Sequence, residues 1–94
     1  MEFKTQKELF KYKYENSNGC SELSGKPLLP VTHTQFYWQF IHVLSKGAYP
    51  SYKLRLENIM LALPEEHENQ EQYPAFIEKR DELKPKYYKE FYNR

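Results

Sequence analysis

The chain has a single cysteine, almost no net charge and no long apolar run. One cysteine, Cys20, excludes an intramolecular disulfide and any zinc knuckle built from several cysteines. No apolar run approaches the roughly 20 residues that a membrane-spanning helix needs. The N-terminal segment MEFKTQKELFKYKY is charged throughout and contains no apolar core of a signal peptide. We therefore expect a cytoplasmic domain that has no membrane partner.

The net charge of +1 excludes an overall basic field, but the charges are unevenly distributed. Up to Arg55 there are eight Lys or Arg and four acidic residues, and beyond it there are six and nine. A basic half of this kind is typical of a surface that faces a phosphate backbone. An ordinary solvated surface explains the same counts, so the charge pattern alone leaves both interpretations open.

Aromatic residues, in contrast, are abundant. Nine Tyr, six Phe and one Trp make up 17% of the chain. This proportion is too high for a chain that never packs, and each buried tyrosine needs a partner for its hydroxyl group. With 94 residues, the chain is expected to form one domain, residues 1–94, near the lower limit of self-sufficient folding.

The first half of the sequence predicts a helix, a turn-rich segment and a strand. Residues 5–14 favour a short helix, with Thr5 and Glu8 at the spacing of a capping box. Residues 15–30 contain Asn-Gly, Ser-Gly and two prolines, which predict turns. Residues 35–44, QFYWQFIHVL, are aromatic and β-branched as in a buried strand, and a helix for part of this stretch stays open.

The second half predicts a further strand followed by a helix. In residues 54–63, LRLENIMLAL, alternate positions are occupied by Leu54 and Leu56 and then by Ile59, Leu61 and Leu63, and the alternation changes phase at Asn58. A change of phase indicates a bend or a bulge. Pro64 suits the first turn of a helix, so we expect PEEHENQEQY to be helical and to carry His67.

The C-terminal residues 74–94 predict one or two helices, broken before Pro85. Their apolar and aromatic residues are expected to pack back on the core; these are Phe76, Ile77, Leu83, Tyr87, Tyr88, Phe91 and Tyr92.

Two stretches carry the residues of chemical interest. In FIHVLSKGAYP, His42 ends an apolar run before a glycine loop, and in NIMLALPEEH, Asn58 opens an apolar run that ends nine residues later in His67. The pattern resembles the HNH nuclease motif, in which two strands and one helix wrap a single divalent metal ion. The resemblance covers about residues 24–71, and SGKPL at its start is similar to the segment that precedes the motif in many phage HNH proteins. It implies an α+β fold with a ββα-metal (HNH, or His-Me finger) core and flanking N- and C-terminal helices.

The resemblance also implies an activity, that of a metal-dependent DNA endonuclease or nickase, phage-encoded and acting in the host cytoplasm. Phosphodiester hydrolysis needs a water molecule deprotonated near neutral pH, which histidine can do, and a metal ion that polarises the scissile phosphate. Carried over position by position, His42 is the general base and His67 a metal ligand. Asn58 braces the loop between the strands.

Glu71 lies four residues after His67, where colicin-type DNases carry a second metal ligand. On a continuous helix these two positions share a face, so both side chains could reach one ion. A carboxylate and an imidazole together suit Mg²⁺, Mn²⁺ or Zn²⁺. By the same resemblance Lys46 and Arg55 would contact phosphate groups of DNA, although an ordinary surface charge is an equal interpretation for each.

The sequence departs from the family at the metal site and at the zinc knuckles. Ile41 stands directly before His42, where HNH nucleases commonly have a metal-binding Asp or His, and isoleucine cannot bind metal. The paired CxxC motifs of many members are absent, and Leu63 and Glu66 stand where the second pair would be. The apolar core is then expected to replace the structural zinc.

Three functions therefore remain in competition. The first is the nuclease. The second is a catalytically silent protein of the same fold that binds nucleic acid or a protein partner, which the presence of Ile41 supports. The third is a small aromatic-rich interaction domain in which the motif arises by chance. The sequence leaves the oligomeric state open.

Overall fold

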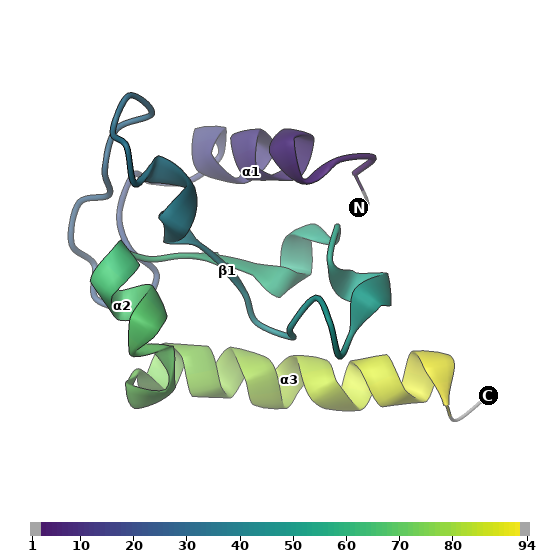
Figure 1. Cartoon of the computed structure of the whole chain (residues 1–94). Coiled ribbons are helices and arrows are strands. Elements are labelled where there is room, and N and C mark those ends of the chain that lie inside the picture. Colours follow the sequence, from purple (N-terminus) through teal and green to yellow (C-terminus); the bar gives the residue numbers. More distant parts are fainter. Residues whose placement is uncertain (1–2, 93–94) are drawn as a thin grey trace.

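The computed structural model describes residues 3–92 and shows within them a small α+β protein. Two short strands, β1 (Phe40–His42) and β2 (Ile59–Leu61), form an antiparallel sheet. The sheet lies between the first helix, α1 (Gln6–Glu15), and the last, α3 (Pro74–Phe91), as Figure 1 shows. A third helix, α2 (Pro64–Glu68), follows β2 directly. The α+β class expected from the sequence is therefore confirmed.

Helix α1 begins where the capping residues predict. The Thr5 hydroxyl accepts a hydrogen bond from the Glu8 backbone N–H at 3.2 Å, which satisfies one of the unpaired amides of the first turn. At the other end, Asn16 donates a hydrogen bond from its side-chain amide to the Tyr12 carbonyl at 2.9 Å. Leu9 and Phe10 are buried, so the helix presents one apolar face to the sheet.

The predicted strand over 35–44 is much shorter in the structure. A 3₁₀ turn, Phe36–Gln39, precedes β1, because the buried residues Phe36, Gln39 and Phe40 recur with the spacing of a helical turn instead of alternating. The Gln39 side chain is buried and fixes this turn, since it accepts from the Leu29 N–H at 2.6 Å and donates to the Phe36 carbonyl at 3.1 Å.

The second predicted strand, 54–63, is also shortened. A 3₁₀ turn, Leu56–Asn58, occupies its first half and ends at the residue where the alternation changes phase. The bend predicted at Asn58 is therefore confirmed. The antiparallel pairing of the two apolar segments is confirmed as well, with Phe40 opposite Leu61 and His42 opposite Ile59.

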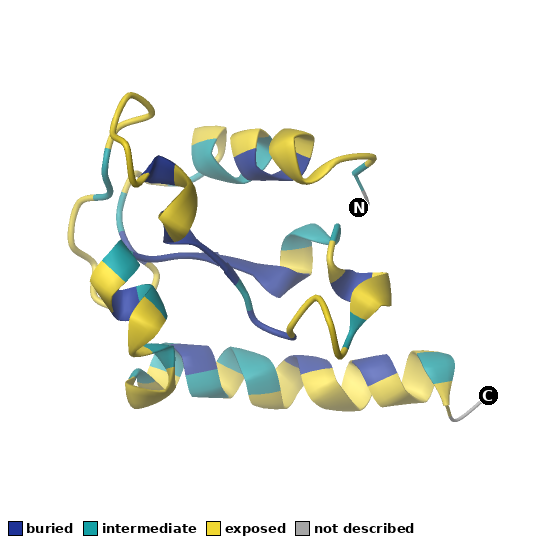
Figure 2. Ribbon diagram, viewed as in Figure 1, coloured by how far each residue is buried: buried dark blue, intermediate teal, exposed yellow. Residues whose placement is uncertain are grey.

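The two faces of the sheet belong to two different apolar clusters. Successive side chains of a strand point to opposite faces. Phe40 packs with Leu9 and Phe10 of α1, whereas Ile41 packs with Phe76 and with other buried residues of α3 and the loops. Figure 2 shows the sheet almost entirely buried between the helices that cover it.

The helix predicted over 64–73 ends early. Helix α2 stops at Glu68, and a separate 3₁₀ turn, Gln70–Gln72, leads into α3. Asn69 terminates α2, because its side-chain amide donates to the Glu65 carbonyl at 2.9 Å and its backbone leaves the helical conformation. The expectation of one continuous helix here is wrong.

Helix α3 is a single helix that runs through Pro85, so the predicted break before that proline is also wrong. Pro85 is exposed, whereas Leu83 and Tyr87 on either side of it are buried in the core. Their burial offsets the backbone hydrogen bond that proline cannot make. Tyr88 and Tyr92, expected to pack on the core, are exposed. Within residues 3–92 no helix combines the length and the apolarity needed to cross a membrane.

Candidate active site

His42 is the last residue of β1, and its side chain lies on the sheet face that α1 covers. Its ring centre is 5.9 Å from that of Phe10. The Nε2 atom lies 3.0 Å from the Lys53 carbonyl oxygen. Because a carbonyl oxygen only accepts hydrogen bonds, Nε2 carries the hydrogen in the neutral ring and Nδ1 keeps its lone pair. His42 is therefore held in the tautomer in which Nδ1 can accept a proton.

The surroundings of His42 also favour its neutral form. Burial lowers the pKa of His42 below its usual value, and the nearby charges of Lys46 and His67 lower the pKa further. The hydrogen bond to the Lys53 carbonyl opposes these effects without cancelling them. A base with a lowered pKa is unprotonated and ready to act at neutral pH.

Asn58 fastens the strand that carries His42 to the loop between the strands. Its side chain is fully buried. The carbonyl oxygen of the side chain accepts from the Leu44 N–H at 2.7 Å, and the amide donates to the carbonyl oxygens of Leu44 at 3.0 Å and Tyr52 at 3.3 Å. Tyr52 directly precedes Lys53, whose carbonyl bonds His42. By holding the Tyr52 carbonyl, Asn58 therefore fixes the backbone that orients His42.

His67 lies on α2, which packs against the 3₁₀ turn Phe36–Gln39. Its Nδ1 atom is 2.9 Å from the Trp38 carbonyl oxygen. This hydrogen bond fixes the ring orientation and leaves the lone pair on Nε2, the arrangement typical of histidines that bind metal through the other nitrogen.

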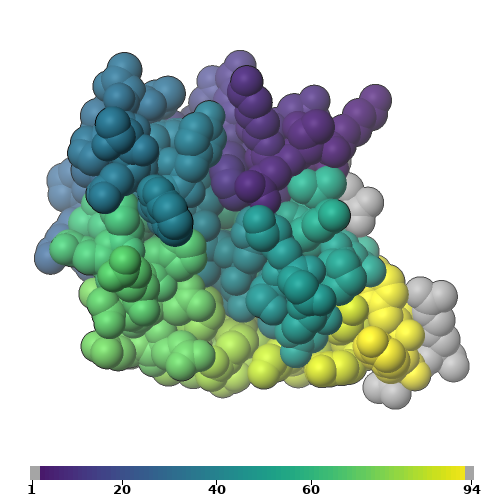
Figure 3. Space-filling model, viewed as in Figure 1, coloured from purple at the N-terminus to yellow at the C-terminus, as the bar shows by residue number. Residues whose placement is uncertain are grey.

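The two histidines line the same surface hollow. The hollow has a volume of about 390 Å³ and lies between α1, the turn before β1 and α2. Figure 3 shows these segments meeting on one face of the molecule. We call it the histidine hollow; besides His42 and His67, its wall includes Phe10, Trp38, Lys46 and Gln70.

Glu71 does not join His67 in the histidine hollow. It sits on the 3₁₀ turn after α2, its side chain is 77% exposed, and its carboxylate lies 3.6 Å from Arg80 of α3. Because α2 ends at Glu68, the two residues do not share one helix face, and Gln70 lines the histidine hollow instead. Glu71 and His67 both line a separate hollow of about 320 Å³ along the segment 67–72. Within residues 3–92, no group of three or more His, Cys, Asp or Glu side chains is placed to hold a metal ion.

Ile41 points away from the histidine hollow. It is fully buried and belongs to the apolar cluster on the α3 side of the sheet. The alternation of side chains along β1 places it on the face opposite His42. In this structure the residue at position 41 therefore does not face the space where His67 could hold an ion.

The two candidate phosphate-binding residues lie in different surroundings. Lys46 lines the histidine hollow, and its ammonium group is 3.3 Å from the Gln6 side-chain oxygen. Arg55 is engaged with the C-terminal part of α3, where it makes two hydrogen bonds to the Glu90 carboxylate at 2.8 and 2.5 Å. Its guanidinium also lies over the Tyr52 ring, 4.3 Å from the ring centre. Lys46 alone of this pair borders the hollow.

Glu66, on α2, is a buried carboxylate. Glu66 is almost completely buried and accepts hydrogen bonds from the Ser21 hydroxyl at 2.5 Å and the Leu63 N–H at 2.9 Å. Burial by itself raises the pKa of Glu66, but the hydrogen bonds outweigh it and hold the pKa below its usual value. This polar link joins α2 to the segment that carries Ser21.

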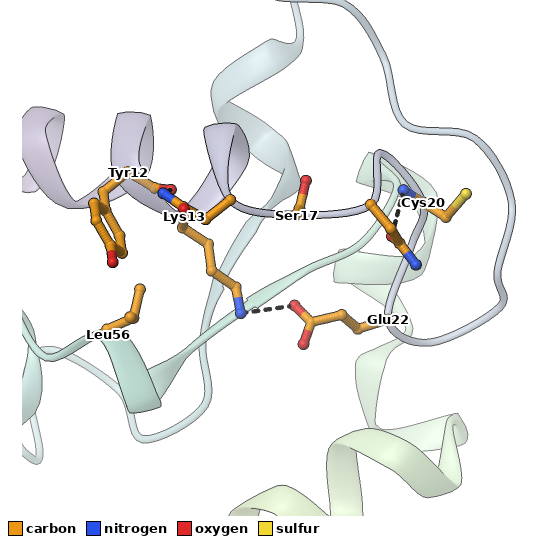
Figure 4. A pocket seen from close by; sticks show the side chains of 8 residues that line it. Tyr12, Lys13, Ser17, Cys20, Glu22 and Leu56 are labelled. Carbon is orange, nitrogen blue, oxygen red and sulfur yellow. Dashed lines mark hydrogen bonds and ion pairs between the residues drawn. The ribbon is translucent and has the colours of Figure 1, made fainter.

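A second hollow of similar size, about 380 Å³, lies beyond the C-terminal end of α1. Figure 4 shows Tyr12, Lys13, Cys20 and Glu22 around it, with the Lys13 ammonium 3.2 Å from the Glu22 carboxylate. Glu22 also accepts from the Leu61 N–H at 2.6 Å. Its charged groups are thus paired within the fold and its wall contains no histidine, so its chemistry does not suit proton transfer.

Sequence reasoning identified the histidines but not the groups that orient them. Those groups are the backbone carbonyls of Trp38 and Lys53, which carry no side-chain signal. Gln70 was missed because the helix was expected to continue through it, and Ser21 because its partner Glu66 is 45 residues away.

Comparison of the chain with protein-family models, with curated proteins and with solved structures gives no match.

Proposed function

We propose that this protein is an HNH-type, metal-dependent endonuclease or nickase that hydrolyses phosphodiester bonds in DNA. One observation carries the proposal: His42 and His67 line one hollow, each bonded to a backbone carbonyl through one ring nitrogen and free at the other. Two histidines prepared in this way suit different tasks, one as a base and one as a metal ligand.

In the proposed mechanism, His42 activates the attacking water. Its Nδ1 lone pair takes a proton from the water as the water oxygen bonds to phosphorus, the bond from phosphorus to one sugar oxygen breaks, and the ring becomes an imidazolium ion. The Lys53 carbonyl accepts from Nε2–H and stabilises this cation. Lys46, on the wall of the same hollow, would face the negative charge of the phosphate.

The donor groups fit a weakly held divalent ion, Mg²⁺, Mn²⁺ or Zn²⁺. His67 offers Nε2 as a ligand, and its bond to the Trp38 carbonyl is the kind of support that orients metal-binding histidines. With few protein ligands, water and phosphate oxygens must complete the coordination. When bound, the ion would polarise the scissile phosphate and stabilise the leaving oxygen. Glu71 would have to leave Arg80 to contribute, so we do not include it among the ligands.

A catalytically silent protein with the same fold is the second candidate. Ile41 is buried away from the histidine hollow, and Glu71 lies outside it beside Arg80, so neither of the additional ligands that the motif would supply borders that hollow. Such a protein would bind nucleic acid or a protein partner without cutting.

A plasmid-nicking assay separates the two candidates. Supercoiled DNA is incubated with Mg²⁺, Mn²⁺ or Zn²⁺ and one of three purified proteins: the parent, His42→Ala or the control His33→Ala. His33 is a matched control because its ring is exposed and accepts a hydrogen bond from the backbone N–H of Gln35. We expect His42→Ala to lose about 100-fold or more in rate while it keeps its affinity for metal, because the base does not hold the ion. His33→Ala should cut normally.

Two outcomes would contradict the proposal. Equal nicking by His42→Ala and the parent would remove His42 from the mechanism. Absence of nicking by the parent with every metal would favour the silent protein.

A further inference from the structure

Two aromatic side chains beside the histidine hollow, Tyr37 and Trp38, are largely exposed. Tyr37 is 58% exposed and Trp38 is 64% exposed, although both belong to the 3₁₀ turn before β1. Tyr37 leans on Phe36, with ring centres 5.2 Å apart, and is thereby held in place. Within residues 3–92 the Trp38 indole makes neither a ring contact nor a side-chain hydrogen bond.

Both rings lie next to the proposed reaction site. Tyr37 and Trp38 line the histidine hollow, and the Trp38 carbonyl is the group that orients His67. Tyr37 also lines an adjoining groove of about 260 Å³ between α1 and the loop around Val31, so its ring belongs to the walls of both the groove and the hollow. The groove wall is mainly apolar.

The charges around this surface are mostly positive. Lys7 and Lys11, four residues apart on α1, border the groove, and Lys46 borders the hollow. Glu15 is the one acidic residue in the two walls. In Figure 3, α1 and the segment that carries the two rings lie on the same face. Flat exposed rings beside a line of cations match a ligand that has both bases and phosphates.

We propose that Tyr37, Trp38, Lys7 and Lys11 form a binding surface for single-stranded nucleic acid that leads the strand into the histidine hollow. The strand must be unpaired, because a ring can stack only on a base whose face is free, and inside a duplex neighbouring bases cover both faces. Stacking tolerates every base, so binding is independent of sequence. The claim that this surface guides a substrate strand rests on the proposed nuclease function. The claim that it binds single strands is tested separately.

Binding is measured without cleavage, in EDTA, by fluorescence anisotropy of a labelled oligothymidylate of about 15 nucleotides. A hairpin duplex and an abasic oligonucleotide of equal charge serve as competitors. We expect the single strand to bind best, and the abasic strand to bind weakly because it keeps the phosphates but lacks the bases. Trp38 is the single tryptophan of the chain, so stacking should also quench the intrinsic fluorescence.

Two matched pairs of variants test the parts of the surface. Trp38→Ala should weaken binding by about 5- to 150-fold, whereas Tyr92→Ala, which removes an exposed ring at the far end of α3, should bind as the parent does. The double variant Lys7→Gln/Lys11→Gln should lower the slope of log K against log salt by about 1.4. Lys84→Gln/Lys89→Gln, with the same charge change on α3, should leave it unchanged. Thermal unfolding verifies that each variant is folded.

Equal binding of the single strand and the duplex would overturn the proposal, as would an unchanged affinity of a folded Trp38→Ala. Failure of every oligonucleotide to bind would also overturn the proposal, and a protein would then be the remaining candidate ligand of Tyr37 and Trp38. The nicking assay is independent: a protein that binds the single strand through Trp38 but cuts nothing refutes the nuclease and keeps the binding surface.

Discussion

Each histidine of the candidate site gains its chemical character from one backbone carbonyl. The Lys53 carbonyl accepts a hydrogen bond from Nε2 of His42, and the Trp38 carbonyl accepts one from Nδ1 of His67. The nitrogen left free for reaction is therefore Nδ1 in His42 and Nε2 in His67. Burial and the nearby charge of Lys46 also lower the pKa of His42. At the scale of single residues, hydrogen bonds to the backbone therefore decide which nitrogen of each ring is free to react.

The lowered pKa of His42 predicts the acidic limb of the pH profile. The unfolded chain protonates this histidine near its usual pKa of about 6.5, and the folded protein does so only at lower pH. The neutral base thus persists below that value, so the acidic midpoint of kcat/KM should lie below about 6.5. The free energy of unfolding should fall as pH drops through this range, because the unfolded state binds the proton first.

Single-turnover nicking between about pH 5 and 8, with metal saturating at each pH, measures this midpoint. Metal binding needs a neutral His67, so saturation must be verified at the acidic end. A midpoint at or above the ordinary histidine pKa would show that burial does not control the pKa of His42.

Ile41 gives a second prediction at the residue scale. Ile41→Asp should not create a metal ligand, because the side chain points into the apolar cluster on the α3 side. It should lower the free energy of unfolding by about 3 kcal/mol or more, since it removes apolar packing and buries an unpaired carboxyl group. Ile41→Val should cost only about 0.5–1.5 kcal/mol. Chemical denaturation and metal titration calorimetry check both; tighter metal binding by a folded Ile41→Asp would contradict the assignment of this side chain.

At the scale of elements, two polar side chains hold the short strands and α2 in place. Glu66 links α2 to Ser21 across 45 residues of sequence, and Asn58 links the end of β1 to the loop before β2. A two-stranded sheet with three residues in each strand has few backbone hydrogen bonds of its own. Buried side-chain hydrogen bonds therefore supply connections that the sheet lacks.

Asn58→Ala should damage both stability and activity. It leaves the Leu44 N–H and the carbonyls of Leu44 and Tyr52 without their partner in a buried place, at a cost of about 1–3 kcal/mol. Asn16→Ala is the matched control, because its side-chain amide bonds a single exposed carbonyl, that of Tyr12, and lies outside the histidine hollow. Denaturation curves and nicking rates measure the effect. If Asn58→Ala is as stable and as active as the parent, Asn58 does not brace the site.

At the scale of the whole molecule, the two candidate basic residues lie in different surroundings. Lys46 lies on the wall of the histidine hollow, whereas Arg55 joins the loop before β2 to Glu90 of α3. Position along the chain did not distinguish them, since both belong to the basic half of the sequence. In the fold, Lys46 borders the histidine hollow and Arg55 forms an ion pair with Glu90.

The different positions of Lys46 and Arg55 predict different effects when each is replaced by glutamine. Lys46→Gln should weaken nucleic-acid binding and lower its salt dependence, by about 0.7 in slope for each phosphate of a single strand that the lysine neutralises. Arg55→Gln should leave that slope unchanged and lower stability by up to about 1 kcal/mol, because its partner Glu90 is partly exposed. Salt titrations and denaturation of both variants test the division; a reduced slope for Arg55→Gln would place that residue at the nucleic-acid surface as well.

The sequence by itself determined the α+β class, the cap of α1 at Thr5, the bend at Asn58 and the antiparallel pairing of the two apolar segments. These depend on spacing and side-chain type within short stretches, where apolar periodicity and capping chemistry operate. Tertiary structure decided the rest. Packing of Leu83 and Tyr87 carries α3 through Pro85, and the early end of α2 directs Gln70, not Glu71, to the histidine hollow. The orientation of His42 and His67 depends on distant backbone carbonyls, which have no local signature because a backbone carbonyl is the same in every residue.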